Sequence, residues 1–322
     1  MLDFEMSVTG RPSAQEICEG LAGRDAEREE RFLNEERAIV SVAVMFTHWT
    51  IADDEHAFFG PLVRGLRLRA NELGCDLIFC APSRDHWLEE EAVDRMVQHG
   101  TEGLVVLGGA DGNPDVLSRR FSGLPTVFVE YDVLGSRSAH VEIDNASAFG
   151  EIVLHLSSTG HSRIATITGN LDMRVSAERL SAYRATLARL GYQARPEYVQ
   201  AGDFLQQSGY DAMTRLLALA EPPDAVAVAC DAMAAGAIRA IEDAGLRCPE
   251  DIAIGGFDDA PWAALMRPAL TTVRQPAEEM GAAAVDSVVA MIRDPSLDPP
   301  VVQLQGTLVV RESCGAGLRP QA

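Results

Sequence analysis

Residues 223–259 have the sequence PDAVAVACDAMAAGAIRAIEDAGLRCPEDIAIGGFDD. After Asp224 the run from 225 to 230 is apolar, as in parallel strands that are buried on both faces. We expect Asp231 to cap the helix that comes next and Gly245 to end it. A second apolar run, 251–259, then leads from a strand into an acidic loop. A strand, a helix and a strand in this order are typical of a doubly wound parallel sheet.

The same alternation extends over most of the chain. Upstream of this unit, apolar runs predict strands at 38–46, 75–80, 103–109, 125–130, 162–169 and within 194–202. Helical spacing of apolar residues predicts helices over about 58–73, 88–97, 145–159, 176–190 and 208–220. Downstream, Pro276 ends the stretch TTVRQP (271–276) and is well placed in the first turn of a helix to about 292, and short strands at 301–304 and 307–311 close the chain. The sequence therefore predicts an α/β protein of two doubly wound parallel-sheet lobes with a ligand cleft between them.

Composition limits the possible partners and the compartment. The chain has 322 residues and a formal charge of −21, from 48 acidic and 27 basic side chains. Such a field opposes nucleic acid and anionic lipid, since both are bound through clustered Lys and Arg. The sequence shows no secretory signal, no apolar run near the length of about 18 residues that would span a membrane, and no CxxC pair among its six cysteines. We therefore expect a cytoplasmic protein without a membrane segment.

Residues 1–37 differ from the rest of the chain. They contain ten acidic and five basic side chains and lack a convincing apolar stripe. We expect an acidic N-terminal extension that is frayed or docked on a partner.

Polar and aromatic side chains come directly after most of the predicted strands, at the edge where ligands bind in parallel sheets. Carboxylates, an arginine and aromatic rings in one cleft suit a polyol or a nucleoside, although each such residue taken alone is more readily a helix cap or a loop residue. The candidates are Thr47, His48, Trp49, Ser83, Arg84, Glu130, Tyr131, Asp132, residues 170–179, Asp203, Phe204, Cys230, Asp231, Asp258 and Asp259.

Other kinds of site are disfavoured. The stretch HWTIADDEH at 48–56 has metal-binding side chains, but its spacing matches no established zinc pattern. The loop LGGADG at 107–112 is neither a dinucleotide-binding nor a Walker motif, and no nucleophile stands beside a base. We expect no metal, no cofactor and no enzymatic activity.

Several long, collinear motifs are similar to the effector-binding core of LacI/GalR-family transcriptional regulators. The motifs are HLSSTGHSRIATITG (155–169), GYDAMTRLLAL (209–219), residues 223–263, PALTTVRQP (268–276) and LVVRES (308–313). The resemblance covers about residues 38–315. It implies a periplasmic-binding-protein-like fold of type I, with an N-lobe of 38–146 plus 277–303, a C-lobe of 147–276 plus 304–315, and a tail of 316–322. It also implies a homodimer in which a sugar-like effector changes the lobe arrangement allosterically.

The resemblance also implies roles for individual residues. Arg179 matches the arginine that clamps the effector, Asp258 matches the effector-binding aspartate, and Phe204 matches the aromatic residue that stacks on the ligand. Glu130 stands where Asp is usual, and Cys230, before Asp231, stands where many members have Asn. The remaining candidates are the pocket aromatics Phe58 and Phe59, Gln275 near the hinge, and Trp49 in a loop at the cleft mouth that is longer than usual.

The front of the chain departs from the family pattern. Family members begin with a basic helix-turn-helix headpiece, and residues 1–37 show no such motif. We therefore expect that the chain does not bind DNA directly. The alternative function is a solute-binding protein of a sugar importer, which shares the fold but predicts export.

Overall fold

The computed structural model describes residues 40–46, 58–80, 96–108, 123–130 and 138–316. Within these residues the chain forms two six-stranded sheets. The first sheet has the order β11-β5-β4-β3-β1-β2, and every neighbouring pair in it is parallel. Its strands are β1 (Val40–Phe46), β2 (Cys75–Cys80), β3 (Gly103–Leu107), β4 (Thr126–Val129), β5 (Ser138–Ile143) and β11 (Val301–Leu304).

The second sheet has the order β12-β10-β9-β8-β6-β7. All its pairs are parallel except that of β10 with β12, which is antiparallel. Its strands are β6 (Ile164–Thr168), β7 (Val199–Ala201), β8 (Ala225–Val228), β9 (Ala253–Asp258), β10 (Thr271–Arg274) and β12 (Thr307–Val309). Two parallel α/β sheets confirm the expected fold class.

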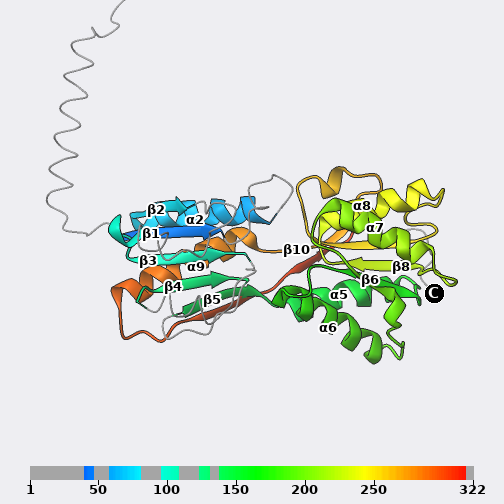
Figure 1. The fold of residues 1–322 in the computed structure, drawn as a ribbon, viewed down its shortest axis with the longest axis horizontal. Helices are drawn as coiled ribbons and strands as arrows, with labels where there is room; N and C mark the ends of the chain where they lie inside the picture. The colour runs from blue at the N-terminus through cyan, green and yellow to red at the C-terminus, as the bar shows by residue number, and fades with distance from the viewer. Residues whose placement is uncertain (1–39, 47–57, 81–95, 109–122, 131–137, 317–322) are drawn as a thin grey trace, which may run out of the picture. The chain divides into compact units, whose positions relative to one another are not determined.

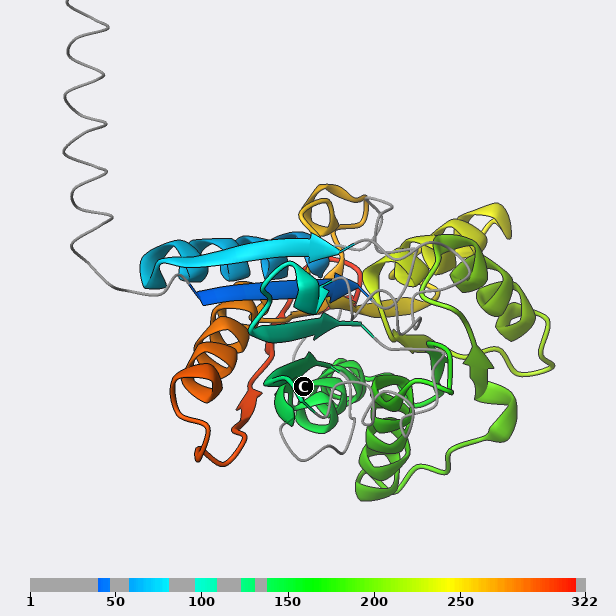
Figure 2. The ribbon, with the colours of Figure 1, turned by 60° about the vertical axis from the view of Figure 1, so that its left-hand side comes forward.

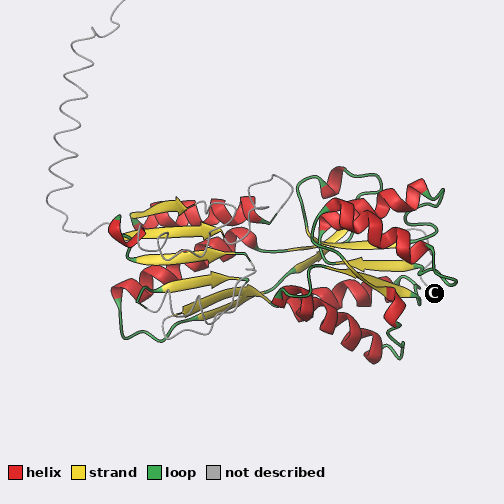
Figure 3. Cartoon of the chain, in the orientation of Figure 1, coloured by secondary structure: helices red, strands yellow, loops and turns green. Residues whose placement is uncertain are grey.

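Helices cover the sheets and complete the two cores. Helices α2 (Phe59–Leu73) and α9 (Ala277–Arg293) pack on each other beside the first sheet (Figure 1). Around the second sheet, α5 (Asn145–Ser158) pairs with α6 (Arg174–Arg189), and α7 (Gln206–Leu217) pairs with α8 (Asp231–Asp243). These two helix pairs lie on opposite faces of that sheet (Figure 3). The apolar runs of the sequence thus become strands that are buried from both sides, such as β3, β4, β6 and β8.

The chain passes between the two sheets three times. The passages come after β5, β10 and β11, because the next element in each case belongs to the other sheet or packs on it. Figure 2 shows the last strands of the chain leaving one sheet for the other. The first and third passages lie together, since the backbone N–H of Asp144 donates to the carbonyl of Leu304 at 2.8 Å.

Most predicted elements agree with the structure to within a few residues. Gly74 and Gly245 adopt the left-handed conformation that ends α2 and α8, with φ of 65° and 76°. Strand β5 was not predicted, because SAHVEI alternates in burial instead of forming an apolar run. The predicted strand at 194–202 is a short 3-10 turn, Pro196–Tyr198, and then the three residues of β7. The expected helix over 88–97 lies mostly outside the described residues.

Across the described ranges, no helix combines the length and the apolar character that a membrane crossing requires.

Candidate ligand-binding site

The predicted ligand-binding residues of the C-terminal half gather at the carboxyl edge of the second sheet. Asp258 ends β9, Cys230 comes just after β8, and Arg179 lies in the second turn of α6. The parallel order of β9, β8 and β6 brings these positions together, although up to 79 residues of sequence separate them.

Arg179 is held rigidly at this edge. Its Nε donates to Oδ1 of Asn145 at 2.8 Å, and its Nη1 donates to the carbonyl of Ala229 at 2.8 Å. The guanidinium carbon lies 3.8 Å from the centre of the Phe257 ring, a cation–π contact. Among the described residues, no hydrogen bond engages Nη2, so one edge of the guanidinium is left for a ligand. The residue is only 5% exposed, and burial lowers its pKa.

Asp258 and Gln275 form a bonded pair beside Arg179. Nε2 of Gln275 donates to Oδ1 of Asp258 at 2.7 Å. Oε1 of Gln275 is buried without a hydrogen-bond partner among the described residues, and therefore offers an acceptor. Burial raises the pKa of Asp258 to about 6, although the positive charge of Arg179 opposes the rise.

Asp231 does not cap α8, which corrects the sequence-based expectation. Its Oδ1 accepts from the hydroxyl of Thr272 at 2.6 Å, and its Oδ2 accepts from the N–H of Ala260 at 2.7 Å. Burial and the neighbouring Asp258 carboxyl raise the pKa of Asp231 well above its usual range. The carboxyl thus ties the loop after β9 to β10 and is 1% exposed, so it supports the site from behind.

Cys230 is the residue that caps α8. Its Sγ accepts from the N–H of Met233 at 3.4 Å and donates to the carbonyl of Phe204 at 3.5 Å. Burial raises the pKa of this thiol, which remains protonated and can serve as that donor. Cys230 therefore positions the Phe204 loop.

Phe204 lies with its ring directly against Gly169, just after β6. Its backbone has a φ of 71°, a conformation that non-glycine residues rarely adopt. Glu130 and Asp258 share this property, with φ of 59° and 119°. The fourth such residue in the described ranges is Asp259, with φ of 58°. Strained backbone of this kind concentrates at functional sites.

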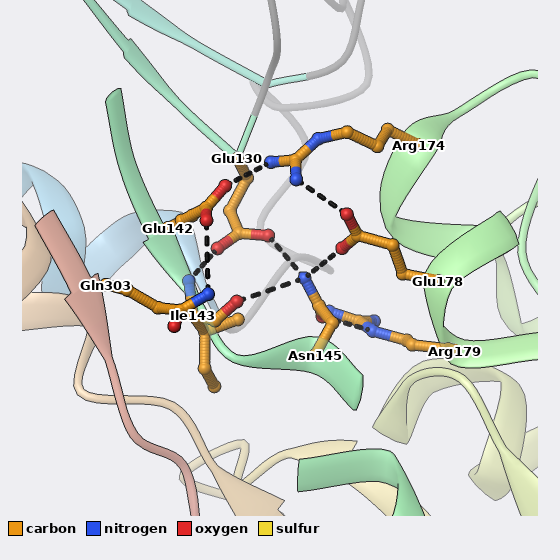
Figure 4. A network of polar contacts seen from close by, with 8 residues as sticks. All are labelled: Glu130, Glu142, Ile143, Asn145, Arg174, Glu178, Arg179 and Gln303. Carbon is orange, nitrogen blue, oxygen red and sulfur yellow. Dashed lines mark hydrogen bonds and ion pairs between the residues drawn. The ribbon is translucent and has the colours of Figure 1, made fainter. Parts of the chain in front are cut away.

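Glu130 comes directly after β4 of the first sheet. Its carboxylate accepts from the N–H of Ile143 at 2.6 Å and from Nδ2 of Asn145 at 3.1 Å. Burial raises its pKa. Asn145, which the sequence pattern does not single out, also holds Arg179 and thereby links the two residues (Figure 4). Recognition of β5 would have revealed it, because Asn145 comes two residues after that strand.

Phe58 and Phe59 have different surroundings, since Phe58 lines a cavity and Phe59 packs on other aromatic rings. Phe58, Asp258 and Gln275 help to line a cavity of about 300 Å³ at the second passage of the chain. The Phe59 ring packs on Phe58, with centroids 5.2 Å apart, and on Phe46, with centroids 6.4 Å apart. Phe59 therefore belongs to an aromatic cluster beside the cavity. Trp49 and the possible metal-binding stretch 48–56 lie outside the described residues.

Comparison with known proteins identifies the family. A family model described as a periplasmic binding protein-like domain matches residues 153–314. The chain is 34% identical over 265 residues to the ribose operon repressor of Escherichia coli (strain K12), with 82% of this chain and 80% of the relative covered. The chain belongs to the LacI family of transcriptional regulators.

Two further comparisons bear on this LacI-family chain. It is 33% identical over 260 residues to the HTH-type transcriptional regulator CelR of Thermobifida fusca, with 80% of this chain and 76% of the relative covered. A solved complex of the transcriptional regulator CelR with cellobiose has a TM-score of 0.78 and 30% identity, covering 91% of this chain and 90% of the other.

These findings decide between the functional alternatives. The chain is a LacI-type regulator with an effector-sensing core, and its relatives are named as regulators of transcription, not as enzymes. The alternative of a solute-binding protein for a sugar importer receives no support from them. The expectation about a headpiece concerns residues 1–37, which lie outside the described residues.

Proposed function

We propose that this LacI-family chain binds a small polar effector, which is a sugar, a polyol or a nucleoside, at the edge formed by Arg179 and Asp258. It acts in the cytoplasm as a homodimer whose lobe arrangement depends on effector occupancy. The N-lobe comprises 38–146 plus 277–303, and the C-lobe comprises 147–276 plus 304–315. Phe204 packs on the apolar face of the effector, and Gln275, Glu130, Phe58 and Trp49 complete the pocket.

The observation that carries this proposal is the way Arg179 is held. Two hydrogen bonds and an aromatic face fix the guanidinium, while Nη2 has no hydrogen-bond partner in the described part of the chain. A fixed donor beside the acceptors of Asp258 and Gln275 suits vicinal hydroxyl groups, because each hydroxyl both donates and accepts. The relatives support the same class of ligand, since one is named for ribose and one was solved with cellobiose.

The test is isothermal titration calorimetry with D-ribose, cellobiose, other pentoses and hexoses, polyols and nucleosides. We expect at least one to bind, and we expect Arg179→Lys to weaken that binding at least tenfold, because lysine lacks the planar guanidinium whose separate nitrogens make the two anchoring bonds and present the third to the ligand. Arg195→Lys is the matched control. Arg195 also lies over an aromatic ring, that of Tyr198, but its hydrogen bond goes to the carboxylate of Glu221, its side chain is 40% exposed, and it belongs to no part of the site. Equal binding by the two variants would refute the assignment of Arg179.

The homodimer is tested separately by size-exclusion chromatography with light scattering. We expect twice the mass of the chain at micromolar concentration. A strict monomer would refute the dimer without affecting the assignment of the ligand site.

A further inference from the structure

A network of charged side chains extends from the ligand site toward the first sheet. Arg174, in the first turn of α6, donates through Nη1 to Oε1 of Glu178 at 2.6 Å and through Nη2 to Oε2 of Glu142 at 2.8 Å. Glu142 lies in β5 of the first sheet, whereas α6 packs against the second. This arginine therefore forms an ion pair between the lobes (Figure 4).

The ion pair is continuous with the site through a single side chain. Nδ2 of Asn145 donates to Oε2 of Glu178 at 3.2 Å, and Oδ1 of Asn145 accepts from Arg179 at 2.8 Å. Asn145 is 2% exposed and begins α5, directly after the first passage between the sheets. Asn145 therefore connects the fixed guanidinium of Arg179 to Glu178, the carboxylate that also holds Arg174.

The network also reaches the third passage of the chain. Nε2 of Gln303, in β11, donates to Oε1 of Glu142 at 3.2 Å. Glu142 is thus bonded from both sides, to a strand of its own sheet and to a helix of the other lobe. It stands one residue before Ile143, whose N–H is bonded to Glu130.

The exposed fractions of Arg174, Glu142 and Glu178 indicate that these side chains fix a geometry more than they add to the free energy of unfolding. The exposed fractions of the side chains are 28% for Arg174, 17% for Glu142 and 33% for Glu178. Nε of Arg174 is buried without a hydrogen-bond partner among the described residues. The attraction of Glu178 and Glu142 outweighs desolvation and raises the pKa of Arg174, yet a partly exposed ion pair of this kind contributes little net stability. The directional bonds that remain do define one relative position of α6 and β5.

We propose that Arg174 is a positioning residue, which fastens the two lobes through Glu142 in the arrangement that Arg179 requires to bind the effector. The idea rests on the proposed function for its ligand, but the fastening itself does not depend on any ligand. Coupling of this kind is reciprocal, so an effector that favours the fastened arrangement is bound more weakly when the fastening is removed.

The experiment compares the full chain with Glu142→Gln, Arg174→Gln, the double variant, and Glu221→Gln as the matched control. Glu221 also accepts from an arginine at 2.6 Å, but it lies within one lobe. Hydrogen exchange of the ligand-free proteins is measured by mass spectrometry, together with calorimetric titration of D-ribose and cellobiose. Arg174→Lys, which can reach just one of the two carboxylates, provides a conservative rescue.

We expect Glu142→Gln and Arg174→Gln each to show faster exchange that is confined to peptides covering 140–146 and 303–307. The control Glu221→Gln is expected to exchange in these peptides like the unaltered chain. The double variant is expected to exchange no faster than either single variant, because all three remove the same interaction, and Arg174→Lys is expected to be intermediate. The dissociation constant of whichever sugar binds should rise about fivefold, which corresponds to about 1 kcal/mol.

Two results overturn the proposal. One is exchange in the two peptides that matches the unaltered chain. The other is faster exchange throughout the second sheet, which indicates a general loss of stability. If neither sugar binds the unaltered chain, the proposed ligand class fails for these two sugars, and the ligand-free exchange still decides the role of Arg174.

Discussion

Gly169→Ala is expected to weaken effector binding while leaving the chain stable. A Cβ at Gly169 would lie 2.5 Å or less from three ring atoms of Phe204. Real Cβ atoms do not approach so closely, so the ring must move away from its position at the ligand site. Gly209→Ala is the natural comparison, since a Cβ there would lie within 2.6 Å of three atoms of Met233. The two overlaps are similar in size but differ in what must move.

The expected magnitudes reflect this difference. At Gly169 the blocking atoms belong to the end of a side chain, and a shift of its rotamer costs about 0.5–1.5 kcal/mol. Alanine recovers about 0.4–1 kcal/mol by restricting the unfolded chain, so the free energy of unfolding should change by less than about 1 kcal/mol. At Gly209 the blocking atoms are the backbone of α8, and the helix pair must separate, which costs about 2 kcal/mol or more. Loss of the stacked ring should weaken effector binding about three- to tenfold.

The assay combines urea denaturation with calorimetric titration of the sugar that binds the unaltered chain. We expect Gly169→Ala to change the affinity and Gly209→Ala to change the stability. Destabilisation of both variants to the same extent would show that the Phe204 ring is fixed as firmly as backbone. Unchanged affinity in Gly169→Ala would show that the ring takes no part in binding.

Three further predictions concern the same edge of the sheet. Arg179→Ala should lower the free energy of unfolding by about 3 kcal/mol, because it leaves two buried acceptors unpaired; urea denaturation should show it, and a loss below about 1 kcal/mol would contradict the buried geometry. Because burial raises the pKa of Asp258 to about 6, its protonated form stabilises the fold fully below about pH 4, and that stabilisation, at most about 3 kcal/mol, is lost as the pH rises through 6. Asp258→Asn should reduce this decline in denaturation series from pH 4 to 7, and an unchanged slope would assign it to other groups. Cys230→Ser should keep the cap of α8 and leave the midpoint of thermal unfolding unchanged, whereas Cys230→Ala should lower the free energy of unfolding by about 1 kcal/mol. Equal thermal midpoints of the two variants would mean that Sγ does not cap the helix.

The elements that could be predicted from the sequence are those whose burial is uniform along the chain. Strands such as β8 and β9 are buried along nearly their whole length, so an apolar run marks them. Strand β5 alternates between buried and half-buried residues and contains His140 and Glu142, and this pattern does not stand out from a polar loop. Asn145 remained hidden for the same reason, because a polar residue indicates a site only when the strand that precedes it is itself recognisable.

The candidate site residues could be proposed from their positions after the strands, but their environments depend on contacts that no local pattern contains. Arg179 is covered by the Phe257 ring, which lies 78 residues further along the chain. Asp231 has the side chain of an N-cap, yet its oxygens reach Thr272 and Ala260 across neighbouring strands, which leaves the cap to Cys230. Competition between a local and a distant partner is settled by tertiary packing, which the sequence pattern does not contain.

The packing of the two lobes indicates where a change of lobe arrangement must take place. A Cβ at Gly65 or Gly281 would overlap the backbone of the opposite helix in the α2–α9 pair, and a Cβ at Gly209 or Gly236 would do so in the α7–α8 pair. Helices in such close contact cannot slide past each other without separating, so each of these two helix pairs is expected to move as a unit. Adjustable contacts remain at the passages between the sheets, where side chains meet through hydrogen bonds and ion pairs whose partners can exchange. A change in lobe arrangement that follows effector binding is therefore expected to alter the polar contacts around Asn145, which join the two sheets beside the fixed Arg179.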